Sequence, residues 1–115
     1  MLWDEHVTRQ QARYDDGLNR LPEEPDARQK QLTRIANAAL GAGFAELMRG
    51  DTKEANRWLL EAACRYHESY EGAPPESWGR MIGAVKLRVI AGDWDGARKD
   101  ARWTLGNGAA AATSA

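Results

Sequence analysis

The chain has 115 residues, of which 43% are hydrophobic and 29% are charged, with 16 basic and 17 acidic side chains. This length suits a single domain. The net charge of −1 lacks the excess of Lys and Arg that binding to a phosphate backbone requires, so we do not expect a nucleic-acid partner.

The sequence also indicates a compartment. No apolar run approaches the roughly 18 residues of a membrane span, and the first residues, MLWDEHVTRQ, include acids where a signal peptide has basic residues and an apolar core. Cys64 is the single cysteine, so no disulfide can form within the chain, which fits a reducing environment. We therefore expect a soluble, cytoplasmic protein without membrane association.

Helix formers are frequent and β-branched residues are scarce, which predicts an all-α protein of about five helices. The first helix, within residues 1–21, has a narrow apolar stripe that suits docking against one neighbour. That stripe comprises Trp3, Val7, Tyr14, Leu18 and Leu21. Pro22 and Pro25 then separate it from the second helix.

The second helix is predicted over residues 26–49. Its apolar face is wide enough to contact neighbours on two sides, and it comprises Leu32, Ile35, Ala36, Ala39, Leu40, Gly43, Phe44 and Leu47. Gly50 is placed to adopt the left-handed conformation that ends a helix. Asp51 can cap the next helix, and Glu54 can complete a capping box with it.

Three further helices follow, at residues 52–70, from about 75 to 92, and from 94 to Gly106 or Gly108. Their predicted buried residues are Ala55, Trp58, Leu59, Ala62 and Tyr66, then Trp78, Met81, Ile82, Val85 and Val89, then Trp94, Ala97, Ala101 and Leu105. Asp93 is the predicted cap of the last helix. We interpret residues 1–108 as one domain with hairpins at 26–70 and 75–106, followed at 109–115 by a flexible Ala-rich tail or the edge of a longer protein.

Two stretches of the chain resemble each other. Residues 39–63 and 81–105 each contain a helix, a Gly-Asp pair and an Ala four residues after the Asp, and the two Gly-Asp pairs are 42 residues apart. Such a pattern predicts repeated antiparallel hairpins stacked on one another. Small residues at the helix crossings allow the close approach that stacking needs.

These residues resemble the tetratricopeptide repeat, in which a small residue in the first helix, Gly-Asp at the turn and two alanines seven residues apart in the second helix recur. The first copy matches at Gly43, Gly50, Asp51, Ala55 and Ala62. The second copy keeps only the turn and the first alanine, and its spacing is longer than the family's roughly 34 residues. The resemblance covers residues 26–106 and implies a superhelix of hairpins that binds proteins, preceded here by a docking helix.

The face of the second helix that would line the groove of such an array is apolar, with Leu40, Phe44 and Met48. We expect the first helix to cover it. An open groove that binds a peptide or a helix is the alternative, as is a hybrid in which the first helix leaves and a partner's helix enters.

Two further residues are candidates for partner binding. Lys86 lies between Ile82 and Ile90 on a strip that also contains Gly79 and Gly83. Its ammonium group either reaches water while the stem packs, or anchors a carboxylate of a partner such as a peptide C-terminus.

Trp103, one of five tryptophans, lies off the predicted buried face of its helix. Exposed Trp is enriched at interfaces, so this residue contacts either a partner or, if the last helix is buried on two sides, the protein itself.

Catalytic and metal sites have little support. Glu61, Cys64, His67 and Glu68 share helical spacing, but zinc sites draw ligands mostly from His and Cys on several elements, so we predict no metal and no cofactor. No nucleophile motif or phosphate loop is visible, so we predict no catalytic residues.

The predicted function is a non-catalytic interaction module or scaffold whose partner is a protein, a peptide or a second copy of the chain. It fits the N-terminal part of a longer helical-repeat protein. The alternative is a small ligand-binding protein or enzyme with a pocket between the first helix and the hairpins. Lys86, Tyr66, Tyr70 or His67 would supply the polar lining of that pocket.

Overall fold

The computed structural model describes residues 2–74 and 79–114, with side chains described up to residue 106. Within these residues the chain forms five α-helices and no strand, which confirms the all-α prediction. The helices are α1 (Leu2–Asn19), α2 (Pro25–Arg49), α3 (Thr52–Glu71), α4 (Met81–Ile90) and α5 (Trp94–Ser114).

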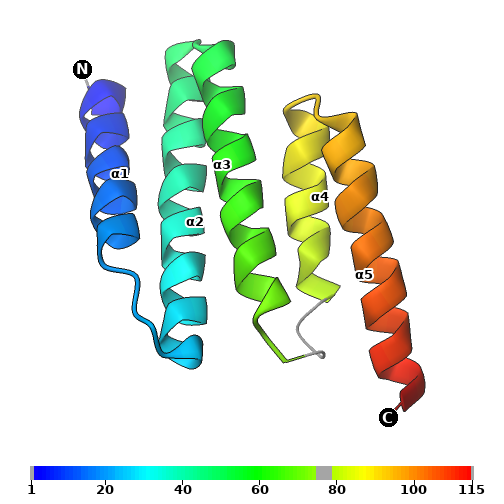
Figure 1. Cartoon of the computed structure of the whole chain (residues 1–115). Coiled ribbons are helices and arrows are strands. Elements are labelled where there is room, and N and C mark those ends of the chain that lie inside the picture. Colours follow the sequence, from blue (N-terminus) through cyan, green and yellow to red (C-terminus); the bar gives the residue numbers. More distant parts are fainter. Residues whose placement is uncertain (1, 75–78, 115) are drawn as a thin grey trace.

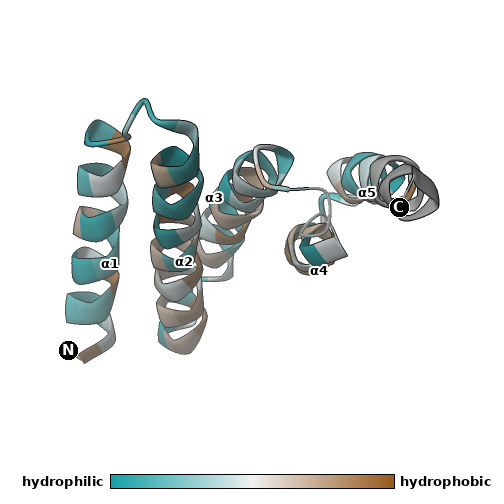
Figure 2. Cartoon of the chain, turned by 90° about the horizontal axis from the view of Figure 1, so that it is seen from below, coloured by the Kyte–Doolittle hydropathy of each residue, from teal (hydrophilic) through white to brown (hydrophobic). Residues whose placement is uncertain are grey.

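The helices follow one another across a flat molecule of 52 × 32 × 16 Å. Helices α2 and α3 form one antiparallel hairpin, α4 and α5 form a second, and α1 lies against α2 (Figure 1). Each helix packs mainly on its neighbours in the sequence. Figure 2 shows that α4 is displaced to one side of the line through α3 and α5.

Both hairpin turns form as the Gly-Asp pairs predict. Gly50 and Gly92 are the two glycines with positive φ among the described residues, at 88° and 83°. The side chains of Asp51 and Asp93 each accept a hydrogen bond from the backbone N–H three residues later, at 3.1 and 3.0 Å. Glycine can adopt this left-handed conformation without steric cost, and the aspartate then satisfies a free N–H of the next helix.

The predicted capping box at the start of α3 is only half formed. The Asp51 side chain caps the helix, but the carboxylate of Glu54 pairs with Arg57 at 2.9 Å instead of turning back. The backbone N–H of Asp51 donates to the carbonyl of Glu46 at 2.9 Å. Because this donor is already satisfied within the turn, Glu54 is free to pair along its own helix.

Small residues bring α2 and α3 together. The buried alanines at this contact are Ala36, Ala39, Ala42, Ala55, Ala62 and Ala63. A Cβ added to Gly43 would lie 2.9 Å from Cδ2 of Leu59, so this crossing leaves no room for a larger side chain. Close packing of this kind is what the repeat pattern predicts.

Helix α1 is part of the core rather than a loose appendage. A Cβ on Gly17 would lie 2.7 Å from Cγ1 of Ile35, so the two helices are in direct contact there. The ring of Tyr14 meets that of Trp58 edge-on at 5.4 Å, and its hydroxyl donates to Glu61 of α3. Arg65 Nε donates to the same hydroxyl at 3.1 Å. Burial, followed by the bond to Glu61, raises the pKa of Tyr14.

The orientation of α4 differs from the prediction. Met81, Ala84 and Leu87 are its buried residues, whereas Ile82 is exposed. Apolar residues surround most of this helix, so their periodicity alone could not orient it. Trp78 and the predicted start of this helix near residue 75 lie outside the described residues.

Helix α5 and the start of α1 also differ from the prediction. Trp94 and Leu105 are exposed, and so is Trp3. Among the described side chains of α5, which end at residue 106, the buried ones are Ala97 and the polar Asp100 and Thr104, whose hydrogen bonds compensate for their burial. The helix continues to Ser114, beyond the two glycines where its end was predicted.

Candidate protein-binding surface

One face of α2 is apolar and uncovered. Leu40, Phe44 and Met48 are four residues apart and therefore lie in a row along the helix. Leu40 packs partly against the core, but Phe44 is 52% exposed and Met48 is 63% exposed. The predicted cover by the first helix is therefore wrong, and the alternative of an open surface describes this face.

Helix α1 does not cover this row, because close contacts hold it on another side of α2. Gly17 of α1 lies against Ile35, and Gly41 of α2 lies against Gln10, where an added Cβ would be 3.1 Å from Cδ of the glutamine. Glycine on each helix allows a near approach of the backbones. That approach fixes α1 at the Ile35 side and leaves Phe44 without a neighbour to cover it.

Helix α4 has a row of residues at the equivalent positions of the second hairpin. Residues 82, 86 and 90 lie 42 positions after residues 40, 44 and 48, which is the separation of the two Gly-Asp pairs. They are Ile82, Lys86 and Ile90, and all three are exposed. The second and third positions of the row are thus exposed in both hairpins, whereas the first is exposed at Ile82 and partly buried at Leu40.

A hollow near the start of α4 is bordered by α2, α3 and Arg80, and none of the six row residues lines it. A pocket of about 320 Å³ is lined by Lys30, Thr33 and Arg34 of α2, by Tyr70 of α3 and by Arg80, which directly precedes α4. Of these α2 residues, Lys30 and Thr33 lie on the side of the helix that carries Phe44, whereas Arg34 lies about 80° away from it. We use the name open surface for the two rows together, which comprise Leu40, Phe44, Met48, Ile82, Lys86 and Ile90.

Lys86 is the charged member of the open surface. It is exposed, and no carboxylate among the described residues forms an ion pair with it. Its neighbours along the row, Ile82 and Ile90, are also exposed. A cation between two uncovered isoleucines is available both to water and to an acidic group of a partner.

Trp103 does not belong to this surface. It is half-buried, packs against the core and lies with its ring 5.6 Å from the ring of His67. Helix α5 therefore contacts the rest of the protein on two sides, as the second interpretation of Trp103 required. Its ring contributes to the contact between α3 and α5.

A buried ionic network that the sequence analysis missed connects α3, α4 and α5. Asp100 is 3% exposed and accepts hydrogen bonds from Arg88 Nε at 2.6 Å and from the ring of His67 at 2.9 Å. Arg88 also pairs with Asp93 at 3.0 Å. Burial alone would lower the pKa of Arg88, but its hydrogen bonds to Asp100 and Cys64 and the charge of Asp100 raise it overall. We interpret this network as structural, because its charges are satisfied by one another.

The four side chains considered as metal ligands bind separate partners. Glu61 accepts from Tyr14, Glu68 pairs with Arg65, His67 bonds to Asp100, and the Cys64 thiol lies 3.6 Å from Arg88. Within the part of the chain that the structure describes, no three His, Cys, Asp or Glu side chains are arranged so that they could hold a metal ion.

The polar groups suggested for a ligand pocket are also dispersed. Tyr66 donates its hydroxyl to Asn37 and stacks on Tyr70, with ring centroids 6.0 Å apart. His67 faces α5 instead. Lys86 lies on the open surface, so these four side chains do not line one cavity.

No protein-family model, curated protein or solved structure matches this chain. Among the helices in the described residues, none combines the length and the apolar character needed to cross a bilayer. The function proposed below therefore follows from the residues and their geometry alone.

Proposed function

We propose that this protein is a non-catalytic, tetratricopeptide-like interaction module whose open surface binds an amphipathic helix of a partner protein. The observation that carries the proposal is that both hairpins leave equivalent positions uncovered. Monomeric proteins usually bury such rows, and a contiguous exposed apolar patch is typical of a binding site. The cytoplasmic location expected from the single cysteine belongs to the same proposal.

The apolar residues supply the binding free energy. Full burial of a Phe, Met or Ile side chain is worth about 1.5–3 kcal/mol, so covering half-exposed side chains contributes roughly 1 kcal/mol each. The exposed fractions are 52% for Phe44, 63% for Met48 and 61% for Ile90. Because association also costs translational and side-chain entropy, a dissociation constant of about 1–100 μM is reasonable.

Lys86 defines the chemistry of the partner. The partner must place an acidic residue opposite Lys86 and apolar residues opposite Ile82 and Ile90. A helix with two apolar residues about two turns apart and Glu one turn from each has this pattern. The acid would contribute mainly to specificity and to the rate of association, since exposed ion pairs add little to affinity.

The test uses synthetic helical peptides of defined sequence. One peptide carries an apolar stripe with Glu in its centre, a second has Lys in place of that Glu, and a third is a scrambled control. We expect the Glu peptide to bind in fluorescence anisotropy and the other two to bind at least tenfold more weakly. Equal binding of all three would contradict the proposal.

Substitutions in the protein locate the binding site. Phe44→Asp is expected to weaken binding of the Glu peptide more than tenfold, and Lys86→Ala about threefold, with unchanged melting temperatures because both residues are exposed. Leu105→Asp is the matched control, since Leu105 is 71% exposed on a different helix. Equal losses in the Phe44 and Leu105 variants would show that the open surface is not the site.

Self-association is measured in parallel by light scattering. A dimer that Phe44→Asp dissociates would identify a second copy as the occupant and would overturn the assignment of a partner helix. A monomer that binds the Glu peptide supports the assignment.

A further inference from the structure

A second concave site lies between α1 and α2 and shares Arg34 with the hollow near the start of α4. Its volume is about 480 Å³, within the range of small-molecule sites. The residues that matter for its chemistry are Gln10, Arg13, Gln31, Arg34, Ile35 and Ala38. It is located where the sequence allowed a pocket, but none of the side chains suggested for that pocket lines it.

The floor of this pocket is apolar and rigid. Ile35 is 1% exposed and Ala38 is 6% exposed, and both belong to the core. Because Gly17 packs against Ile35, α1 is held in place at this point. Ile35 and Ala38 thus form a closely packed floor that is itself almost entirely buried.

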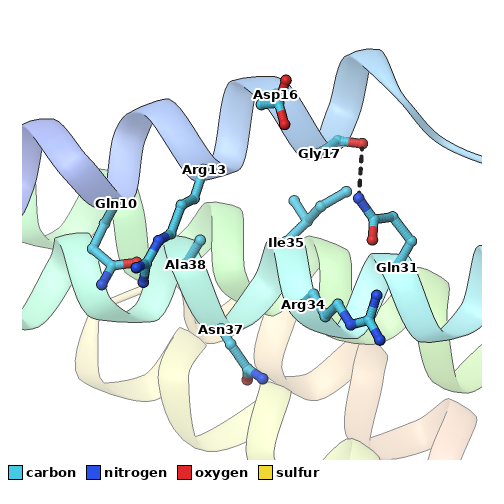
Figure 3. A pocket seen from close by; sticks show the side chains of 9 residues that line it. All are labelled: Gln10, Arg13, Asp16, Gly17, Gln31, Arg34, Ile35, Asn37 and Ala38. Carbon is cyan, nitrogen blue, oxygen red and sulfur yellow. Dashed lines mark hydrogen bonds between the residues drawn. The ribbon is translucent and has the colours of Figure 1, made fainter.

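The two ends of the pocket are cationic. Figure 3 shows Arg13 beside Gln10 at one end and Arg34 beside Gln31 at the other, with Ile35 and Ala38 between them. No described residue forms an ion pair with either arginine. Both guanidinium groups can therefore offer their paired N–H donors to an external carboxylate.

The one acid at the pocket does not neutralise these cations. Asp16 pairs with Arg20 at 3.0 Å, and its side chain points away from α2 (Figure 3). Gln31 Nε2 lies 3.5 Å from the carbonyl oxygen of Gly17, to which it donates, so this amide is oriented by α1. The pocket thus combines two uncompensated positive charges with amide groups at their sides.

We propose that this pocket binds a small aliphatic dicarboxylate, one carboxylate at Arg13 and the other at Arg34, with the methylene chain over Ile35 and Ala38. Two separated guanidinium groups match two separated anions, whereas a single phosphate or carboxylate would engage only one of them. The apolar floor favours a methylene chain over a polar linker.

The binding test is titration of the full chain with succinate, glutarate, adipate, pimelate and suberate at low ionic strength, followed by NMR chemical shifts. We expect one chain length to bind best, at least tenfold more tightly than butyrate, which has only one carboxylate. Binding of butyrate as tight as that of every diacid would overturn the proposal, as would binding of none of them.

Substitutions then test the two arginines. Arg13→Gln and Arg34→Gln are each expected to weaken binding of the best diacid at least tenfold, and Gln preserves helix propensity. Arg98→Gln makes the same change in net charge on α5, where Arg98 pairs with Asp95 at 3.0 Å, and should leave binding unchanged. An equal loss in all three variants would show a nonspecific charge effect and would refute the site.

Charge-conserving variants provide the second measurement. Arg13→Lys and Arg34→Lys keep the positive charge but lose the planar pair of donors, so we expect a partial loss of about threefold in each. Full retention of affinity in both would contradict recognition by the guanidinium geometry. Thermal melts of every variant report whether the fold is intact, so that a loss of binding is assigned to the pocket only in a folded protein.

Discussion

Replacing Gly17 with alanine tests how α1 is attached to the protein. The new Cβ would lie 2.7 Å from Cγ1 and 3.4 Å from Cδ1 of Ile35. Ile35 is 1% exposed and β-branched, so it has little freedom to move aside. Overpacking of this kind costs about 1–3 kcal/mol, against a gain of at most about 1 kcal/mol from the higher helix propensity of alanine.

We therefore expect Gly17→Ala to lower the free energy of unfolding by about 1–2 kcal/mol, which corresponds to a melting temperature lower by about 4–8 °C in a chain of this size. The assay is urea and thermal unfolding followed by circular dichroism. Gly83→Ala is the matched control, because a Cβ added there meets no atom within 4 Å. That control should be more stable than the natural protein by about 0.5–1 kcal/mol.

The comparison between the two glycines is decisive. If Gly17→Ala is as stable as the natural protein while Gly83→Ala is stabilised, α1 does not pack on α2 through this contact. The contact of α1 with α2 would then not explain why the open surface is uncovered.

Two further predictions concern buried charge. Desolvation raises the pKa of Glu46, so the contribution of this group to stability is present at low pH and is lost as pH rises through that pKa. Glu46→Gln should remove this pH dependence and should be more stable than the natural protein at pH 7. Urea unfolding between pH 4 and pH 7 measures both effects. Asp100→Asn leaves the partly buried Arg88 without its closest partner and should lower the free energy of unfolding by about 3 kcal/mol. Asp95→Asn, at a fully exposed carboxylate, should leave that free energy unchanged in the same assay. A loss for Asp100→Asn no larger than that of the exposed control would refute the structural role of the network.

The turns were predictable from sequence because their chemistry is local. Gly50 and Gly92 adopt a conformation that few other residues tolerate, and the aspartate after each glycine caps the next helix. The bounds of α2 and α3 followed from these signals within one residue. Local constraints of this kind do not depend on how the helices later pack.

The sides of α4 and α5 that are buried were not predictable in the same way. Ile82 and Trp94 look like core residues, yet the polar Asp100 is buried. Its burial depends on Arg88 of the preceding helix and on His67 of α3, which approach only once the helices have packed. The sequence signal that was available is the pairing of an arginine before the turn with an aspartate in the helix after it.

Sequence spacing predicted only part of the candidate surface. Leu40, Phe44, Met48 and Lys86 were predicted from their helical spacing, and the structure shows which of them are exposed. What the spacing could not reveal is the position of α1, because that depends on the close contact of Gly17 with Ile35. The arginines of the second pocket were missed because each is an ordinary exposed residue on its own helix.

The order of the helices in space has a kinetic consequence. Every helix touches mainly those next to it along the chain, so the contacts between helices form within hairpins and between neighbouring elements. Proteins with such local topology fold quickly, on the scale of microseconds to milliseconds. The paired helices α2 and α3 should collapse first, and their amide hydrogens should exchange with solvent most slowly. Helix α5 packs on α4 and meets α3 through His67, which bonds to Asp100 and lies against Trp103, so its exchange should report whether these side-chain contacts hold it.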